Sequence, residues 1–137
     1  MTGFILLQEA CDEIDALYEA DEAAAAMFDV LLEVLADDPE MLARLCLPNN
    51  HYTYTPPFEV KRYMDMQRRG KNIFTLKVRN EQGALLPYRM LIGYHAQIDT
   101  YYVLAVLHRE IAYVTTDPIF THVMARYEQA GIPTYSC

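Results

Sequence analysis

The spacing of apolar residues changes once along this chain, and this change limits the possible folds more than any other feature. From Gln8 to about Ala36, apolar side chains recur at the spacing of amphipathic helices. From Ile73 onward, in IFTLKVRN, apolar and polar residues alternate strictly. Alternation is the pattern of a half-buried β-strand, because successive side chains point to opposite faces of a sheet. The sequence therefore predicts helices first and a sheet afterwards.

Residues 4–7 are compatible with a short strand or the first turn of a helix, because so short an apolar run has no clear period, and we favour a strand. An αα-hairpin is expected to follow. The first helix starts at Gln8 and ends near Tyr18. Asp21 can cap the second, which contains the alanine run of residues 23–26 and ends near Ala36. Its expected apolar stripe consists of Met27, Val30, Leu31 and Val34. A shorter helical piece is expected over residues 39–47, and the proline-containing stretch 51–58 is predicted to be an extended link.

The remainder of the chain is predicted to be a three-stranded antiparallel meander followed by a helix. Residues 58–72 form a strand or a helical turn that closes at Gly70. The expected strands, in chain order, cover residues 73–80, 88–96 and 100–110. The last helix begins at Asp117-Pro118 and ends at Gly131. Its expected apolar face consists of Phe120, Val123, Met124 and Tyr127.

Length and composition fit one globular domain over residues 1–137, of which 53% are hydrophobic. No apolar run reaches the roughly 18 to 20 residues that a membrane span needs, and the N-terminus lacks the basic region of a signal peptide. A cytoplasmic protein without membrane contact is therefore expected. The predicted fold class is α+β, with the N-terminal helical hairpin packed on a small, mainly antiparallel twisted sheet and a helix at the C-terminus.

Charge is distributed unevenly along the chain, although the net charge is −8. Residues 1–57 contain twelve acids and one base, which gives −11, whereas residues 58–137 contain ten bases and seven acids, which gives +3. Within residues 58–95 there are eight bases and three acids, a net of +5. The acidic hairpin and the basic sheet are expected to occupy different faces, so that an acidic protein carries a local anion-binding surface.

The sequence offers no motif for a metal or a cofactor. Four histidines are scattered without the close spacing of a helical metal site, and no glycine-rich nucleotide-binding or serine-hydrolase motif occurs. The three cysteines form no CxxC pair. Cys11 and Cys46 are expected to be buried, reduced thiols, and Cys137 is terminal. We therefore expect neither a metal nor a cofactor.

The basic strands contain the residues most able to carry chemistry. Lys77 and Arg79 share one face of a predicted strand, Arg89 opens the next, and His108-Arg109 close the third. Converging cations can stabilise a pentacoordinate phosphorane formed when a ribose 2′-hydroxyl attacks a phosphate, and a histidine can carry the proton. The alternative is that these side chains only solubilise the open side of the sheet.

The order of these segments resembles the RelE/ParE superfamily of toxins from toxin-antitoxin pairs, and in particular its phage-derived, HigB-like branch. The family pattern has a "lwELRv" strand, a "yRilY" strand and an "LLHGFxKKtxktP" segment. Corresponding places here are occupied by IFTLKVR, YRMLIGY and VLHRE, and Pro118 follows His108 by ten residues, as in that pattern. Arg109-Glu110 and Ala112-Tyr113 replace the glycine, phenylalanine and paired lysines of the family.

The resemblance implies a toxin with an antitoxin protein as partner and with mRNA or the ribosome as target. The implied activity is a metal-free endoribonuclease. Lys77 and Arg79 would bind substrate, and the implied catalytic residues are Arg89, His108, Arg109 and Tyr113. An antitoxin segment is expected to carry acidic residues interleaved with apolar anchors, so that it neutralises the sheet cations.

Two further functions stay open at this stage. One is a binding module on the same fold that grips a protein and has lost the nuclease centre. The other is a sheet domain that binds a small ligand. Cations that converge in an open hollow favour catalysis, whereas cations neutralised by Glu81 or Glu110 favour binding.

Overall fold

The computed structural model describes residues 2–43, 45, 58–80 and 82–134. Its centre is a five-stranded mixed sheet with the strand order β1-β5-β4-β3-β2. The strands are β1 (Gly3–Leu6), β2 (Phe58–Arg62), β3 (Ile73–Arg79), β4 (Leu85–His95) and β5 (Thr100–His108). Strands β2 to β5 pair antiparallel in succession, and β1 joins the outer side of β5 in parallel. The fold class is α+β, as the sequence predicts.

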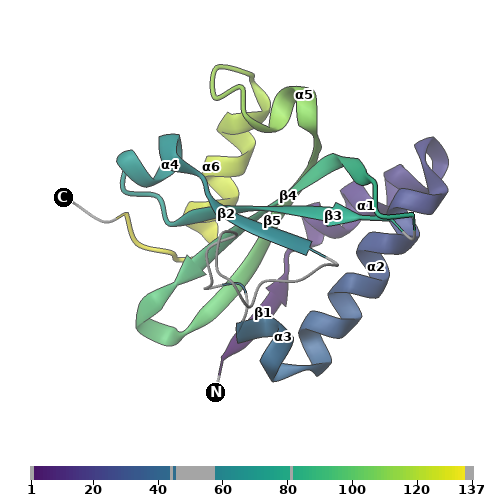
Figure 1. Cartoon of the computed structure of the whole chain (residues 1–137). Coiled ribbons are helices and arrows are strands. Elements are labelled where there is room, and N and C mark those ends of the chain that lie inside the picture. The colour runs from purple at the N-terminus through teal and green to yellow at the C-terminus, as the bar shows by residue number, and fades with distance from the viewer. Residues whose placement is uncertain (1, 44, 46–57, 81, 135–137) are drawn as a thin grey trace.

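Helices cover both faces of this sheet (Figure 1). The first face carries α1 (Gln8–Ala20), α2 (Glu22–Asp37) and α3 (Pro39–Ala43). The second face carries α4 (Met64–Arg68), α5 (Arg109–Ala112) and α6 (Ile119–Gln129). Each face has its own hydrophobic cluster, which includes Phe28, Leu76 and Met90 on the first and Leu91 and Tyr127 on the second. None of the helices in the described residues combines the length and the apolar character that a membrane span requires.

The N-terminal hairpin follows the prediction, with one correction in α2. The Asp21 carboxylate accepts a hydrogen bond from the Ala24 amide at 3.2 Å and so caps the helix. The predicted apolar stripe is confirmed at Leu31 and Met27 but was wrong at Val30, which is 57% exposed. The buried stripe consists of Ala24, Ala25, Phe28, Leu31, Leu32 and Leu35. Small alanines at the start of the helix allow a close approach to the core, which rotates the stripe away from Val30.

The second face of the sheet differs most from expectation. Phe74, Leu76 and Val78 do face the first cluster, as predicted. The opposite side of β3 is only partly open, because α4, α5 and α6 pack over that side of the sheet; Thr75 is 1% exposed there, whereas Lys77 and Arg79 are half-exposed. The third predicted strand also ends early. Residues 109–112 form helix α5 instead of continuing β5.

The α6 helix begins and ends close to the predicted places. The Asp117 carboxylate accepts a hydrogen bond from the Ile119 amide at 3.0 Å, and Gly131 follows the helix with a φ of 78°. On the sheet beneath it, Gly93 leaves room for this segment, because a Cβ there would lie 2.7 Å from Cδ1 of Ile132. The missing side chain of Gly93 therefore lets the C-terminal segment approach β4.

The cysteine prediction needs a correction at Cys11, which is half-buried and not fully enclosed. It lies on α1, and its side of the helix borders Asp12 and Asp15 instead of the core. Cys46 and Cys137 lie outside the described residues, as does most of the predicted link over residues 51–58.

Candidate functional site

Antiparallel pairing places basic side chains in neighbouring positions on the second face of the sheet. Lys77 of β3 lies directly opposite Arg89 of β4, and Glu59 of β2 lies opposite Lys77 on its other side. Arg79 follows two residues after Lys77, beyond an irregularity in the ladder, and its Nη2 forms an ion pair with Glu59 at 3.1 Å. We name Lys61, Lys77, Arg79, Arg89 and Tyr113 together the cationic face.

Arg89 is the unusual member of the cationic face, because its side chain is almost enclosed and lacks a carboxylate partner among the described residues. Only 6% of Arg89 is exposed. Its Nη1 donates to the carbonyl oxygens of Leu86 at 2.9 Å and Tyr88 at 3.0 Å, whereas its buried Nε has no hydrogen-bond partner in the described part of the chain. Buried charges are normally paired, but the described residues provide no carboxylate that compensates this arginine.

Lys77 adds to this positive charge. It is half-exposed and makes no hydrogen bond or ion pair with the described residues. Like charges directly opposite one another on adjacent strands repel, and Lys77 and Arg89 are such a pair. Glu59 offsets Arg79 and does not form an ion pair with Lys77. No carboxylate of the described residues pairs with Lys77 or Arg89, so an anionic group of another molecule would balance these two cations.

Tyrosine side chains border these cations on the α4 side. The Tyr113 hydroxyl reaches Oγ1 of Thr75 at 3.5 Å, and the ring centroids of Tyr63 and Tyr113 are 5.6 Å apart. Tyr63 is buried with its hydroxyl unpaired among the described residues, and burial raises its pKa to about 12. The exposed side chains of Met64, Tyr113 and Val114 lie next in sequence to this contact. The surface thus combines cations with exposed apolar groups.

The predicted site residues divide between the two faces of the sheet. Lys77, Arg79, Arg89 and Tyr113 lie on the second face. His108 pairs with Tyr88, one position along from the Arg89–Leu107 pair, and successive side chains alternate between faces. His108 therefore lies on the first face, beside α1.

Arg109 is exposed at the first residue of α5 and makes no hydrogen bond or ion pair with the described residues. Its backbone lies next to His108, whose Nδ1 accepts a hydrogen bond from the Glu110 amide at 3.2 Å and caps α5. Glu110 Oε2 is 4.0 Å from the same nitrogen. His108 thus has a structural role at the start of α5, and Glu81, the other acid of interest, lies outside the described residues.

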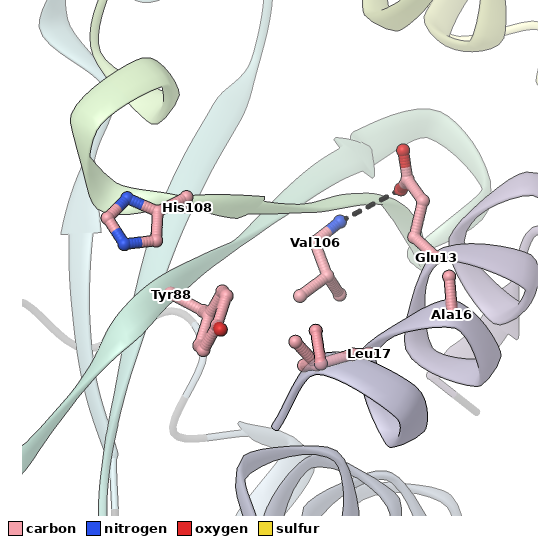
Figure 2. Close-up of a pocket in the computed structure, with 7 residues that line it drawn as sticks. Glu13, Ala16, Leu17, Tyr88, Val106 and His108 are labelled. Atoms are coloured by element: carbon pink, nitrogen blue, oxygen red, sulfur yellow. Dashed lines mark hydrogen bonds between the residues drawn. The ribbon is translucent and has the colours of Figure 1, made fainter. Parts of the chain in front are cut away.

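A pocket of about 270 Å³ lies between α1 and the side of the sheet that carries Tyr88, Val106 and His108 (Figure 2). The ring of Tyr88 meets that of His108 edge-on, with centroids 5.4 Å apart. The lining side chains are Glu13, Ala16, Leu17, Ala20, Tyr88, Val106 and His108. Most of this wall is apolar, and the sheet supplies its one imidazole.

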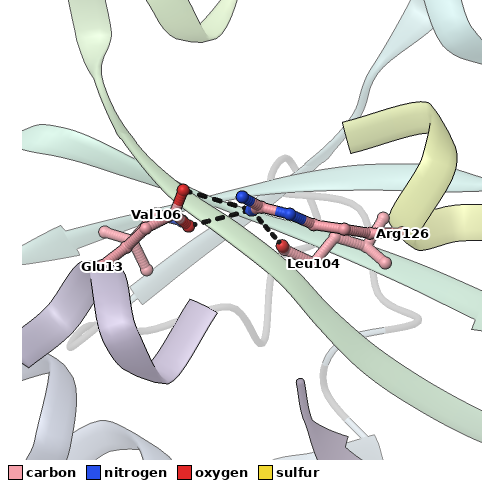
Figure 3. Close-up of polar contacts among 4 residues, drawn as sticks. All are labelled: Glu13, Leu104, Val106 and Arg126. Atoms are coloured by element: carbon pink, nitrogen blue, oxygen red, sulfur yellow. Dashed lines mark hydrogen bonds and ion pairs between the residues drawn. The ribbon is translucent and has the colours of Figure 1, made fainter. Parts of the chain in front are cut away.

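An ion pair closes the edge of β5 beyond the end of β1 (Figure 3). Arg126 of α6 donates from Nη1 to both carboxylate oxygens of Glu13 of α1, each at 3.1 Å, and to the carbonyl oxygen of Leu104 at 2.9 Å. The same Glu13 carboxylate accepts from the amide of Val106 at 3.0 Å. Burial raises the pKa of Glu13, while Val106 and Arg126 act in the opposite direction. The two helix layers are therefore joined around the sheet edge.

The sequence did not single out Glu59, Tyr63, Glu13 or Arg126. The sequence does contain a signal for Glu59: apolar and charged residues alternate in FEVKR, which places Glu59 and Lys61 on the same side of a strand. The Glu13–Arg126 pair joins residues 113 positions apart, and no local pattern indicates such a contact. In the described part of the chain, no cluster of three His, Cys, Asp or Glu side chains is suited to hold a metal ion.

No protein-family model, curated protein or solved structure matches this chain.

Proposed function

We propose that this chain is a protein-binding module whose cationic face holds an acidic segment of a partner polypeptide. The observation that carries the proposal is Arg89, an almost fully buried cation opposite Lys77 with no carboxylate partner in the described residues. Partner carboxylates at this place would remove the repulsion between the two cations. Such a partner plays the part that an antitoxin plays in the RelE/ParE superfamily, which the sequence resembles.

The surroundings of the cations support a polypeptide as the partner. Tyr113 of the cationic face is exposed, and so are Met64 and Val114, the sequence neighbours of the contacting tyrosines Tyr63 and Tyr113. Aromatic and apolar anchors surrounded by charge are typical of protein–protein contacts. An extended segment with alternating acidic and apolar residues would place carboxylates at the cations and its apolar side chains against this patch.

The acids of α1 and α2 do not prevent this binding at physiological ionic strength. They lie on the other side of the sheet, and a helix alone is about 10 Å across. At 0.15 M salt, charges in solvent are screened over about 8 Å. The acidic helices then repel a long polyanion such as RNA more than a short segment bound on the cationic face.

The arrangement favours binding over RNA cleavage. A nuclease centre of the kind that the resemblance implies needs an acid-base group beside the phosphate-binding cations. His108 lies on the opposite face of the sheet from Arg89 and caps α5. Of the implied catalytic residues, Tyr113 is then the one that could carry a proton on the cationic face. Arg79, an implied substrate-binding residue, is already paired with Glu59.

Binding of short, fluorescently labelled poly-L-glutamate oligomers, measured by anisotropy at 0.15 M salt, tests the proposal. Lys77→Glu should weaken binding about ten-fold, as expected when an interfacial charge is reversed. Arg68→Glu is the matched control, since it makes the same change of charge on an exposed α4 residue that is already paired with Asp65. Equal effects of the two substitutions would contradict the proposal.

A parallel titration with poly(U) RNA separates binding from the nuclease function. We expect weaker binding of poly(U) than of poly-L-glutamate, no new RNA ends, and no growth arrest on induced expression in a bacterial host. Cleavage of RNA by the folded chain that is lost in Arg89→Ala would replace the binding module with the ribonuclease.

A further inference from the structure

We propose that the pocket between α1 and the ends of β4 and β5 binds an uncharged, ring-sized molecule that carries a carbonyl group. This site lies on the first face of the sheet, away from the cationic face, and does not depend on the proposed function. Its lining comes from three elements, with Ala16 and Leu17 on the helix side and Tyr88, Val106 and His108 on the sheet side (Figure 2).

The size of the pocket follows from two alanines. Ala16 and Ala20 lie one helical turn apart on α1 and both line the pocket, so the helix leaves the space opposite Tyr88 and Val106 unfilled. The volume is about 270 Å³. A cavity of about 150 Å³ lined by apolar side chains accommodates benzene. A single ring with a short polar substituent is therefore the expected size of ligand.

The hydrogen-bonding groups define the substituent. Nδ1 of His108 accepts the amide hydrogen of Glu110, so in the neutral ring the proton is on Nε2. This N–H donor has no partner among the described residues. The hydroxyl of Tyr88 is likewise unpaired in the described part of the chain. Either donor can be met by a carbonyl oxygen of the ligand.

The charges around the pocket exclude ionic ligands. A carboxylate would face the acids of α1 and Glu110, which lies 4.0 Å from the His108 ring. The same acids attract a cation at long range, but a bound cation needs a carboxylate in the wall of the pocket, and the acid there, Glu13, already accepts from Arg126 and Val106. An uncharged amide or ketone meets neither obstacle.

Three probes with the same ring test this chemistry by two-dimensional NMR of the full chain. Benzamide should shift the His108 ring and Val106 amide signals in a saturable way. Toluene, which lacks the acceptor, should bind about five- to ten-fold more weakly, as expected for the loss of one hydrogen bond. Benzoate should also bind at least five-fold more weakly, because its charge is repelled. Benzoate binding as tight as benzamide, or shifts that never saturate, would overturn the proposal.

Substitutions locate the site. Ala16→Leu fills the pocket and should reduce benzamide affinity at least ten-fold, whereas Ala26→Leu places the same side chain on the exposed side of α2 and should leave affinity unchanged. His108→Asn keeps a cap for α5 but removes the Nε2 donor, and should lower benzamide binding to the level of toluene. Unchanged binding in Ala16→Leu, with unfolding as in the wild type, would show that the ligand binds elsewhere.

Discussion

The ion pair between Glu13 and Arg126 allows a sharp test of how the two helix layers are held on the sheet. The Arg126 side chain is 12% exposed and that of Glu13 is 22% exposed. Arg126→Met keeps an unbranched apolar stem but leaves the Glu13 carboxylate with the Val106 amide alone and the Leu104 carbonyl without its donor. Breaking a buried pair costs about 3–5 kcal/mol, and some exposure reduces this to about 2–3 kcal/mol.

The opposite substitution should be mild. Glu13→Gln can still accept from Val106, and it removes a carboxylate whose pKa is raised chiefly by burial. The charged form is therefore less favoured in the fold than in the unfolded chain, so the neutral amide should change stability by no more than about 0.5 kcal/mol. In the double variant, Glu13→Gln should restore about 1–2 kcal/mol of the loss caused by Arg126→Met.

Urea unfolding at pH 7, followed by far-ultraviolet circular dichroism, gives the four free energies of unfolding in this cycle. Arg68→Met is the control, since it breaks the exposed Arg68–Asp65 pair and should change stability by about 0.5 kcal/mol or less. If Arg126→Met costs no more than Arg68→Met, or if the double variant shows simple additivity, the edge contact does not join the layers as described.

Further predictions concern packing, thiol reactivity and pH. Gly93→Ala brings a methyl group to 2.7 Å from Cδ1 of Ile132 and 3.2 Å from Cδ1 of Leu104, so both side-chain ends must shift, and the free energy of unfolding, measured in urea, should fall by about 1 kcal/mol; an unchanged value would mean that these side chains move aside without cost. Partial burial and then Asp15 raise the pKa of Cys11, so alkylation of its peptide at pH 8, followed by mass spectrometry, should be slower in the native than in the unfolded chain and faster in Asp15→Asn; equal rates would argue against this environment. The pKa of Glu13 in the folded chain is raised above its ordinary value of 4.5, so the folded chain holds this proton more tightly than the unfolded chain does. The resulting stabilisation is present below pH 4.5 and is lost as the pH rises through the pKa of the folded chain. The wild type should therefore lose stability relative to Glu13→Gln between pH 4.5 and neutrality, and a constant difference across this range would contradict the shift.

Most of the fold follows from local patterns. The change of apolar spacing separates the N-terminal helices from the sheet, and residues such as Asp21 and Gly131 mark helix ends because their caps depend on near neighbours. Helix α5 was missed since it is one turn long and follows an apolar strand without interruption. Its cap, His108, is recognisable only once the strand is known to end there.

The candidate site was predictable in part. Alternation along β3 places Lys77 and Arg79 on one side, and pairing of adjacent strands brings Arg89 to the same face. The position of His108 depends on the register between β4 and β5, which includes an irregularity after Leu91. A shift of one residue moves a side chain to the other face, so the sequence alone could not separate His108 from the cations.

Mapping the binding surface tests most directly whether the cationic face binds an acidic polypeptide. Titration of the isotope-labelled chain with poly-L-glutamate at 0.15 M salt should shift the amide signals of Lys61, Thr75, Lys77 and Tyr113, the residues on or under the cationic face. The amide signals of α1 and α2, on the other side of the sheet, should stay in place. Shifts that are absent, or that concentrate on the α1 side around His108, would contradict the account.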